Sequence, residues 1–363
     1  MTLSSSPPRI LIVTDPGLPT RRLERSRDSL EAAIRTSLGE ETTVDHLSRI
    51  VPVTPENELA SEIELPEESQ DVNYDARVFL TEMPLHREKQ PVVAQMDCNR
   101  MHLFVSCPTM GVLYPKKRLV DVISRGLSAL LTGWSEDNGA TQGWNQWRKQ
   151  ENGDEDGIYR LFAHTVTGPT RAVAGMVMAN EPWKTIPKLS SAMSAAAAAG
   201  AFGIFYSSIW QMAATLSPLR LAIITVVSIL VMTTWLILRN RLWDRPLDGG
   251  RVGRVVVLYN LSTIATLIIC IATLYASLFV LILLGGLVVI SPEFMKQTLG
   301  SEPVLSDYLV IAWLSASMGV IAGGLGSGFD AEADMRRMTH GQRERQRVLT
   351  KDRDDSRDEE SSR

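Results

Sequence analysis

The residues best placed to do chemistry follow a short apolar segment near the start of the chain. Arg9–Asp15 (RILIVTD) runs into Pro16-Gly17, and Thr20, Arg21 and Arg22 come soon after it. In α/β proteins the loop between a first strand and its helix often binds ligands, and N–H groups at the start of a helix stabilise a phosphate. The sequence therefore predicts an anion site made by Asp15, Gly17, Thr20, Arg21 and Arg22.

This site has a plainer alternative. Neither GxGxxG nor GxxxxGK[ST], the glycine patterns that cradle phosphates, occurs in the chain. Arg25, Arg27 and Arg35 continue the row of basic residues along the same segment. The alternative is thus a capped helix with a solvated basic face, and the sequence leaves both interpretations open.

No metal or cofactor site is predicted. Four possible metal ligands lie close together in sequence: Asp97, Cys98, His102 and Cys107. Strand alternation, however, places Cys107 on the core face together with Leu103, whereas His102 points to the other face. Asn152, Asp154, Asp156 and Gly157 imitate the start of a calcium loop. Its twelfth position is Ala163, however, where a bidentate Glu is required.

Catalytic groups are scarce as well. The three cysteines form no CxxC pair, and no GxSxG or HExxH motif is present. Glu82, at the end of an expected strand, is the single candidate for an acid or base. The net charge of −4 argues against nucleic acid as a partner.

The first 133 residues predict an α/β domain with a mixed sheet and three layers. Leu23, Leu30, Ile34 and Leu38 share one face of an expected helix over 20–38, which Gly39 ends. A second amphipathic helix is expected over 116–131. The expected strands are 9–15, 43–47, 76–82, 91–97 and 101–107, with the last two as a hairpin.

Residues 134–188 predict a connection between two domains. Ser135–Gly157 is rich in Gly, Asn and Asp and is typical of a flexible insert. Ile158–Asn180 contains two short amphipathic pieces, separated at Gly168-Pro169, that suit helices in a membrane interface. A soluble helical hairpin packed on the first domain is the alternative.

The second half has four stretches without charged residues, and each is long enough to cross a bilayer as a helix. A helix rises about 1.5 Å per residue and a hydrocarbon core is about 30 Å thick. The sequence predicts an all-α, four-helix transmembrane domain over 189–329, followed by a charged tail over 330–363. The spans are expected at about 190–213, 218–238, 258–290 and 308–328.

Arginine placement predicts the orientation of these spans. The loop 239–254 and the tail after residue 330 are rich in Arg, whereas 291–307 carries only Lys296 against three acidic residues. The positive-inside rule then places both termini in the cytoplasm, in a cell membrane. Val255–Pro292 is long for one span, but a single helix is favoured because two would send the Arg-rich tail outside.

Small residues and the absence of buried charge bound what the membrane half can do. Gly319 and Gly323, and Gly324 and Gly328, are each four apart, which lets helix backbones approach closely. They serve packing within the bundle or, alternatively, a homo-oligomer. No Asp, Glu, Lys, Arg or His lies deep within a span, so a pump or secondary transporter is disfavoured.

Several segments together resemble a family of uncharacterised multi-pass membrane proteins of actinobacteria. They are PPRILIVTDPGLPTRR, VFLTEMPL, AFGIFYSSIWQMA, LILRNRLWDRP and GGLGSGF. Proteins similar to these are sometimes labelled methylenetetrahydrofolate dehydrogenase, but the GRSxxVGxP and YxxxK motifs of that enzyme are absent here. The resemblance implies a membrane protein and assigns no functional residue.

The sequence as a whole predicts a protein anchored in the lipid bilayer with a cytosolic α/β domain. The leading hypothesis is a sensor or scaffold whose α/β domain binds a ligand or partner. The alternative is a membrane-anchored enzyme that binds a nucleotide or phosphorylated metabolite at Asp15–Arg22.

Overall fold

The computed structural model describes residues 7–51, 72–87, 90–112, 116–132, 147–149, 157–164, 167–182, 190–243 and 253–326. The chain divides into two compact units. The first comprises Met1–Ala179 with Arg245–Ser262 and His340–Arg363, and the second comprises Asn180–Asp244 with Thr263–Thr339.

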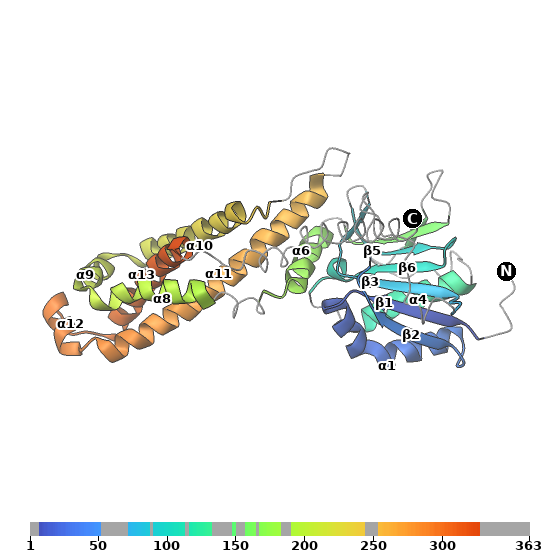
Figure 1. Cartoon of the computed structure of the whole chain (residues 1–363), viewed down its shortest axis with the longest axis horizontal. Helices are drawn as coiled ribbons and strands as arrows, with labels where there is room; N and C mark the ends of the chain where they lie inside the picture. The colour runs from blue at the N-terminus through green and yellow to red at the C-terminus, as the bar shows by residue number, and fades with distance from the viewer. Residues whose placement is uncertain are drawn as a thin grey trace, which may run out of the picture. The chain divides into compact units, whose positions relative to one another are not determined.

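A mixed β-sheet forms the centre of the first unit (Figure 1). In the described part of the chain it contains β1 (Arg9–Thr14), β2 (Thr43–Ser48), β3 (Ala76–Thr81), β4 (Leu85–Arg87), β5 (Gln90–Asp97), β6 (His102–Ser106), β7 (Trp147–Lys149) and β8 (Ile158–Phe162). The strand order is β2-β1-β3-β6-β5-β8-β7, with β4 beside β5. Strands β2, β1, β3 and β6 are parallel to one another. The pairs β4–β5, β5–β6, β5–β8 and β7–β8 are antiparallel.

Two amphipathic helices cover one face of this sheet. They are α1 (Leu18–Leu38) and α4 (Lys116–Thr132). Alternate strand residues such as Ile12, Val78 and Leu103 form a core with the apolar stripes of both helices. Leu11, Val13, Phe79 and Phe104 point to the opposite face and form a smaller core. Burial of apolar surface on these two faces is what orders the sheet.

The predicted mixed α/β domain is confirmed, although its three-layer detail stays a prediction. The expected strands and helices of the first 132 residues appear within one or two residues of their predicted ends. The expected hairpin is the antiparallel pair β5–β6. The weakly helical acidic segment Pro55–Glu68 lies outside the described residues.

The connecting segment differs from the predicted interfacial helices. Ile158–Phe162 is strand β8, because it pairs with the open edge of β5 and so satisfies backbone groups on both. The helix α6 (Thr167–Ala179) packs on α3 (Cys107–Met110). A Cβ at Gly175 would come within 2.2 Å of the Pro108 carbonyl oxygen, so only glycine allows this approach. Most of the predicted flexible insert lies outside the described residues, but Trp147–Lys149 within it is strand β7.

Helices are the only regular secondary structure among the described residues of the second unit. Its helices are α8 (Ser190–Phe205), α9 (Ser207–Thr215), α10 (Pro218–Arg239), α11 (Gly253–Val289, which starts within the first unit), α12 (Pro292–Leu299) and α13 (Leu305–Gly326). Among the described helices α10, α11 and α13 are long and apolar enough to cross a membrane. The pair α8–α9, bent by 84°, makes a fourth crossing only if it forms one span.

The long third stretch is one helix. α11 continues without interruption from Gly253 to Val289, as the single-helix prediction requires. The three apolar helices are compatible with a membrane protein. Their exposed residues include many large apolar side chains, for example Ile223, Leu230 and Leu284, as expected for surfaces that meet lipid.

Small residues bring α8 and α13 into close contact within the chain. A Cβ added at Gly323 would lie 2.4 Å from the backbone of Ala196, and one at Gly203 would lie 1.7 Å from Ser315 Oγ. Gly319 is crowded by Ala196 in the same way. Gly319 and Gly323 therefore serve intrachain packing. Gly328 lies outside the described residues, and the homo-oligomer stays a prediction.

A hydrogen-bonded cluster joins the three long helices. The indole Nε1 of Trp313 donates to Thr225 Oγ1 at 2.7 Å, and the Tyr275 hydroxyl donates to the Trp313 carbonyl at 3.1 Å. Ser317 Oγ lies 3.0 Å from the Tyr275 hydroxyl oxygen. Such bonds between helices contribute about 0.6 kcal/mol each in membranes and mainly fix which faces meet.

The close approach of α8 and α13 makes a direct prediction. Gly323→Ala should destabilise the bundle by about 1–3 kcal/mol, since its Cβ overlaps the backbone of Ala196. Gly286→Ala is the matched control. Its Cβ would meet nothing closer than 3.8 Å, and alanine favours a helix over glycine by up to about 1 kcal/mol. Thermal unfolding of the full chain in detergent should give a lower midpoint for Gly323→Ala alone. Equal midpoints would contradict the packing.

Candidate functional site

Four parallel strands end in hydroxyl residues along one edge of the sheet. In spatial order these are Ser48 of β2, Thr14 of β1, Thr81 of β3 and Ser106 of β6. The chain leaves β1 through α1 to reach β2 on one side, and later returns to place β3 on the other side. This reversal is a topological switch point, the place where open α/β sheets bind ligands.

Asp15 holds the switch point together. Its side chain is fully buried. Oδ2 accepts hydrogen bonds from Thr81 Oγ1 at 2.8 Å and from the Glu82 N–H at 2.9 Å. Oδ1 accepts from the Val51 N–H at 2.8 Å. One carboxylate thus joins the segments that follow β1, β2 and β3.

The hydroxyl groups at this edge bond to one another and to the loops. Thr20 Oγ1 donates to the Asp15 carbonyl at 2.8 Å and lies 2.9 Å from Thr14 Oγ1 and 3.0 Å from Ser48 Oγ. Ser106 Oγ donates to the Met83 carbonyl at 2.7 Å. These bonds order the loops at this edge.

Gly17 is the open point of this edge. It precedes α1 with φ 110°, a conformation that strongly favours glycine, and gives the helix no side-chain cap. Apart from Gly17 and its two chain neighbours, no heavy atom of the described residues lies within 4 Å of the position a Cβ would occupy. A ligand atom could therefore approach the backbone here. Pro19, in the first turn of α1, has no N–H to offer such a ligand.

The arginines of the predicted anion site differ in their surroundings. Arg22 Nη2 donates to the Val112 carbonyl at 3.1 Å, and Nη1 lies 3.5 Å from the Gly111 carbonyl. Arg22 thus ties α1 to the segment that follows α3. Arg21 is half-buried on the same helix. The structure gathers the five predicted residues on one β1–α1 segment, and ligand binding there stays a prediction.

Glu82, the predicted acid or base, is buried at the same edge. Its backbone N–H is one of the three donors to Asp15. Four further residues of this edge, Ser48, Thr81, Ser106 and Val51, were not predicted from the sequence. The hydroxyl residue at each strand end is a signal that could have revealed three of them.

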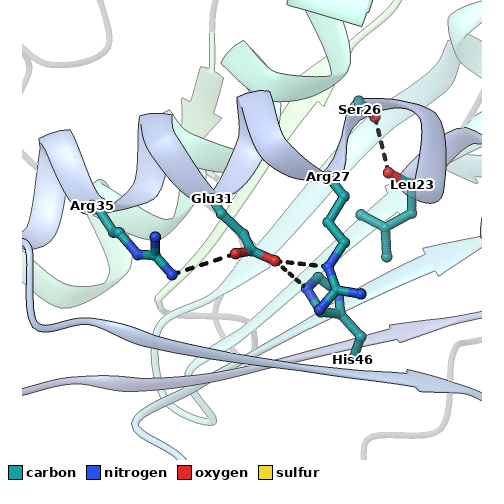
Figure 2. Close-up of polar contacts among 6 residues, drawn as sticks. All are labelled: Leu23, Ser26, Arg27, Glu31, Arg35 and His46. Atoms are coloured by element: carbon teal, nitrogen blue, oxygen red, sulfur yellow. Dashed lines mark hydrogen bonds and ion pairs between the residues drawn. The ribbon is translucent and has the colours of Figure 1, made fainter.

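The basic face of α1 is partly neutralised (Figure 2). Glu31 accepts from Arg27 Nε at 2.8 Å and from Arg35 Nη2 at 3.4 Å, and His46 Nε2 of β2 lies 3.0 Å from Glu31 Oε1. The neighbouring Arg27 lowers the pKa of the Glu31 carboxyl. These pairs fasten the outer face of α1 to β2 and favour the solvated-helix interpretation for Arg27 and Arg35.

Asp97, His102 and Cys107, which lie close together in sequence, are separated in the structure by their different contacts. Asp97 Oδ1 accepts from the N–H groups of Asn99 and Arg100, which closes the turn between β5 and β6. His102 packs edge-on against Phe79 at 5.2 Å, and Cys107 lies in the opposite core, as strand alternation predicts. Within the described residues no three His, Cys, Asp or Glu side chains gather closely enough to hold a metal ion.

Comparison with known proteins returned no match: no family model, curated protein sequence or solved structure is similar to this chain. The resemblance to the actinobacterial membrane proteins therefore stays a prediction.

The Asp15 cluster predicts the effect of one isosteric substitution. Asp15→Asn replaces an acceptor oxygen with a donor NH₂ group, which leaves at least one buried N–H or O–H donor without a partner. We expect a loss of about 1–3 kcal/mol of stability. Urea unfolding of the full chain, read by hydrogen exchange in β1 and β3, measures it. Asp28→Asn, at an exposed site on α1, is the control and should be neutral.

Burial of His102 predicts a pH-dependent stability of the sheet. Burial, aided by Arg77, lowers the pKa of His102 from 6.5 to about 4. Between these two pH values the His102 side chain is protonated in the unfolded chain but neutral in the folded chain. Stability is therefore full above pH 6.5, declines as the pH falls from 6.5 to about 4, and levels off below that.

The expected loss is at most about 3 kcal/mol, from about 1.4 kcal/mol per pKa unit. The urea midpoint of β3 and β6, read by hydrogen exchange between pH 7 and 4, should fall with this profile. His102→Gln should flatten the profile, whereas His164→Gln, at an exposed position, should keep it. An unchanged profile in His102→Gln would contradict the assignment to His102.

Proposed function

We infer that this chain is an integral membrane protein that anchors an α/β ligand- or partner-binding domain, acting as a sensor or scaffold. The observation that carries this function is the switch point between β1 and β3. There Asp15 joins three loops, and the Gly17 backbone is open to an approaching molecule. Open α/β sheets bind their ligands at this position.

The membrane topology we propose has four crossings, and the first is the bent pair α8–α9 counted as one span. Both termini and the Arg-rich loop 239–254 then lie on the cytoplasmic side of the cell membrane, as the positive-inside rule favours. Three helices of sufficient length and hydropathy support the membrane placement. A reporter fused after Arg363 that is active only in the cytoplasm measures the orientation.

The ligand class we propose at the open edge is a phosphorylated metabolite or nucleotide. The start of α1 carries the positive end of the helix dipole, and Arg21 adds a full charge beside it. Arg22 is committed to the carbonyls of Gly111 and Val112, so its removal would alter the loop itself and could mimic a loss of binding. We choose Arg21, whose charge lies at the start of α1, as the position to change.

A ligand screen tests this function. The full chain in detergent is heated with and without inorganic phosphate, nucleotides and phosphorylated metabolites. At a ligand concentration 100 times its Kd, binding should add about 2.7 kcal/mol of stability and raise the midpoint. Arg21→Ala should abolish the ligand-induced rise. Arg25→Ala, exposed one turn further along α1, should keep it.

No rise with any compound in a folded sample would remove the ligand-binding function. That result would favour a scaffold whose α/β domain binds a protein partner.

An enzyme is the second candidate. Glu82 supports it, because a buried carboxyl group lies at the carboxyl end of β3, next to the proposed ligand position. Turnover of any compound that passes the screen, lost in Glu82→Gln with ligand-induced stabilisation retained, would favour the enzyme.

A further inference from the structure

The bend between α8 and α9 is built around a buried tryptophan. The two helices meet at Tyr206 at 84°. Trp210 is buried, and its Nε1 donates to the Gly203 carbonyl at 2.9 Å. The same indole packs edge-on against Phe294 of α12, with ring centroids 5.5 Å apart. The bend is thus fixed by specific contacts on both sides.

Close packing shows which end of the bundle α9 crosses. The backbone of Ala196 crowds Gly323 and Gly319 of α13, whereas Gly203 is crowded by Ser315. Residue numbers rise along α8 as they fall along α13, so these two helices are antiparallel. The Phe205 end of α8 therefore lies at the Leu305 end of α13, and α9 turns across it and packs on α13 and α12.

Two other helix ends belong to the same end of the bundle. α10 begins at Pro218 soon after α9, and α11 ends at Val289 just before α12. Helices that cross a bilayer place such ends at one surface. In the proposed topology this surface is the one opposite the Arg-rich loop 239–254.

Both short helices have a polar outer face and an apolar inner face. On α9, Trp210 and Ala213 are buried while Ser208, Gln211 and Thr215 are exposed. On α12, Met295 is buried while Glu293, Lys296 and Gln297 are exposed. The Gln211 amide donates to the Thr298 carbonyl at 3.4 Å and links the two helices.

Large apolar side chains surround this pair at its edge. Met212 and Phe294 are exposed by 50% and 52%, and they lie beside the polar faces of their helices. Phe205, Leu219 and Leu305, at the adjoining helix ends, are exposed by 61–71%. This apolar rim is continuous along the chain with the exposed faces of α8, α10 and α13. A polar outer face bordered by exposed apolar residues is the pattern of a helix that lies in a membrane interface.

We propose that α9 and α12 form an interfacial cap that binds phospholipid. The cap lies in the plane of the bilayer, in the leaflet opposite the Arg-rich loop. Its polar faces meet headgroups and water, and Met212, Phe294, Phe205 and Tyr206 enter the boundary with the acyl chains. This inference rests on the proposed membrane topology.

Nitroxide depth measurements on the full chain test the cap. Cys98, Cys107 and Cys270 are replaced by Ser, and the protein is reconstituted in vesicles of phosphatidylcholine and phosphatidylglycerol. Single labels are placed through Ser208→Cys, Thr215→Cys, Met212→Cys and Phe294→Cys. Ile223→Cys and Leu230→Cys, exposed and also seven residues apart, are the matched pair on α10. Power saturation with oxygen and with a water-soluble nickel chelate gives the depth of each label.

The cap predicts equal depth at 208 and 215, near the headgroups, with the labels at 212 and 294 reached mainly by oxygen. The α10 pair should differ by about 10 Å, at about 1.5 Å per residue. A similar 10 Å difference between 208 and 215 would overturn the cap, because α9 would then run across the bilayer and not in its plane. Labels at 212 and 294 reached mainly by the nickel chelate would also overturn it, since the cap would stand in water. Equal depths within the α10 pair would overturn the membrane topology itself, and the cap with it.

Discussion

A polar backbone group that is removed from water must find a partner inside the protein, and this constraint shapes both units. In the first unit the problem arises where the parallel strands end, because the ladder no longer supplies partners for the loops. The N–H groups of Val51 and Glu82 lie beyond the ends of β2 and β3. The Asp15 carboxylate accepts from both of them, and from Thr81 as well. The loops that follow β1, β2 and β3 are thus ordered by one side chain, that of Asp15, which directly follows β1.

The second unit meets the same constraint through helices. Hydroxyl groups that face the apolar surroundings bond back to the preceding turn, as Ser228, Thr233 and Ser315 do. Polar side chains between helices bond to one another, as Thr225, Tyr275 and Trp313 do. At the bend between α8 and α9, the indole N–H of Trp210 donates a hydrogen bond to the Gly203 carbonyl. The bonds between helices therefore also select one arrangement of the helices.

The elements that local pattern controls could be predicted from the sequence. The spacing of Leu23, Leu30 and Ile34 specified α1, and the uncharged stretches specified α10, α11 and α13. Strand alternation also placed Leu103 and His102 on opposite faces of the sheet. In all of these cases the pattern of apolar residues along a few helical turns, or along one strand, determines which side chains are buried and so determines the structure.

Features that depend on distant partners could not be predicted. Ile158–Phe162 forms a strand because the edge of β5 is open, and no local pattern shows that edge. The bend at Tyr206 lies inside a stretch without charged residues and depends on contacts of Trp210 with Gly203 and Phe294. For the candidate site, the sequence indicated the β1–α1 loop. The strand order that makes this loop a switch point, and the partners of Asp15, appear only in the folded chain.

The arrangement at the sheet edge favours a binding role over a catalytic one. Thr14, Thr20 and Ser106 share their hydroxyl groups with neighbouring protein atoms, and Asp15 accepts from three donors. A group engaged in this way is ordered but is poorly placed to move a proton to a substrate, since it would first have to break its own bonds. A molecule that contacts the Gly17 backbone, in contrast, meets a loop already joined through Asp15 to β2 and β3. A displacement of that loop would act on three strand ends at once, which is the property that a sensor or scaffold domain requires.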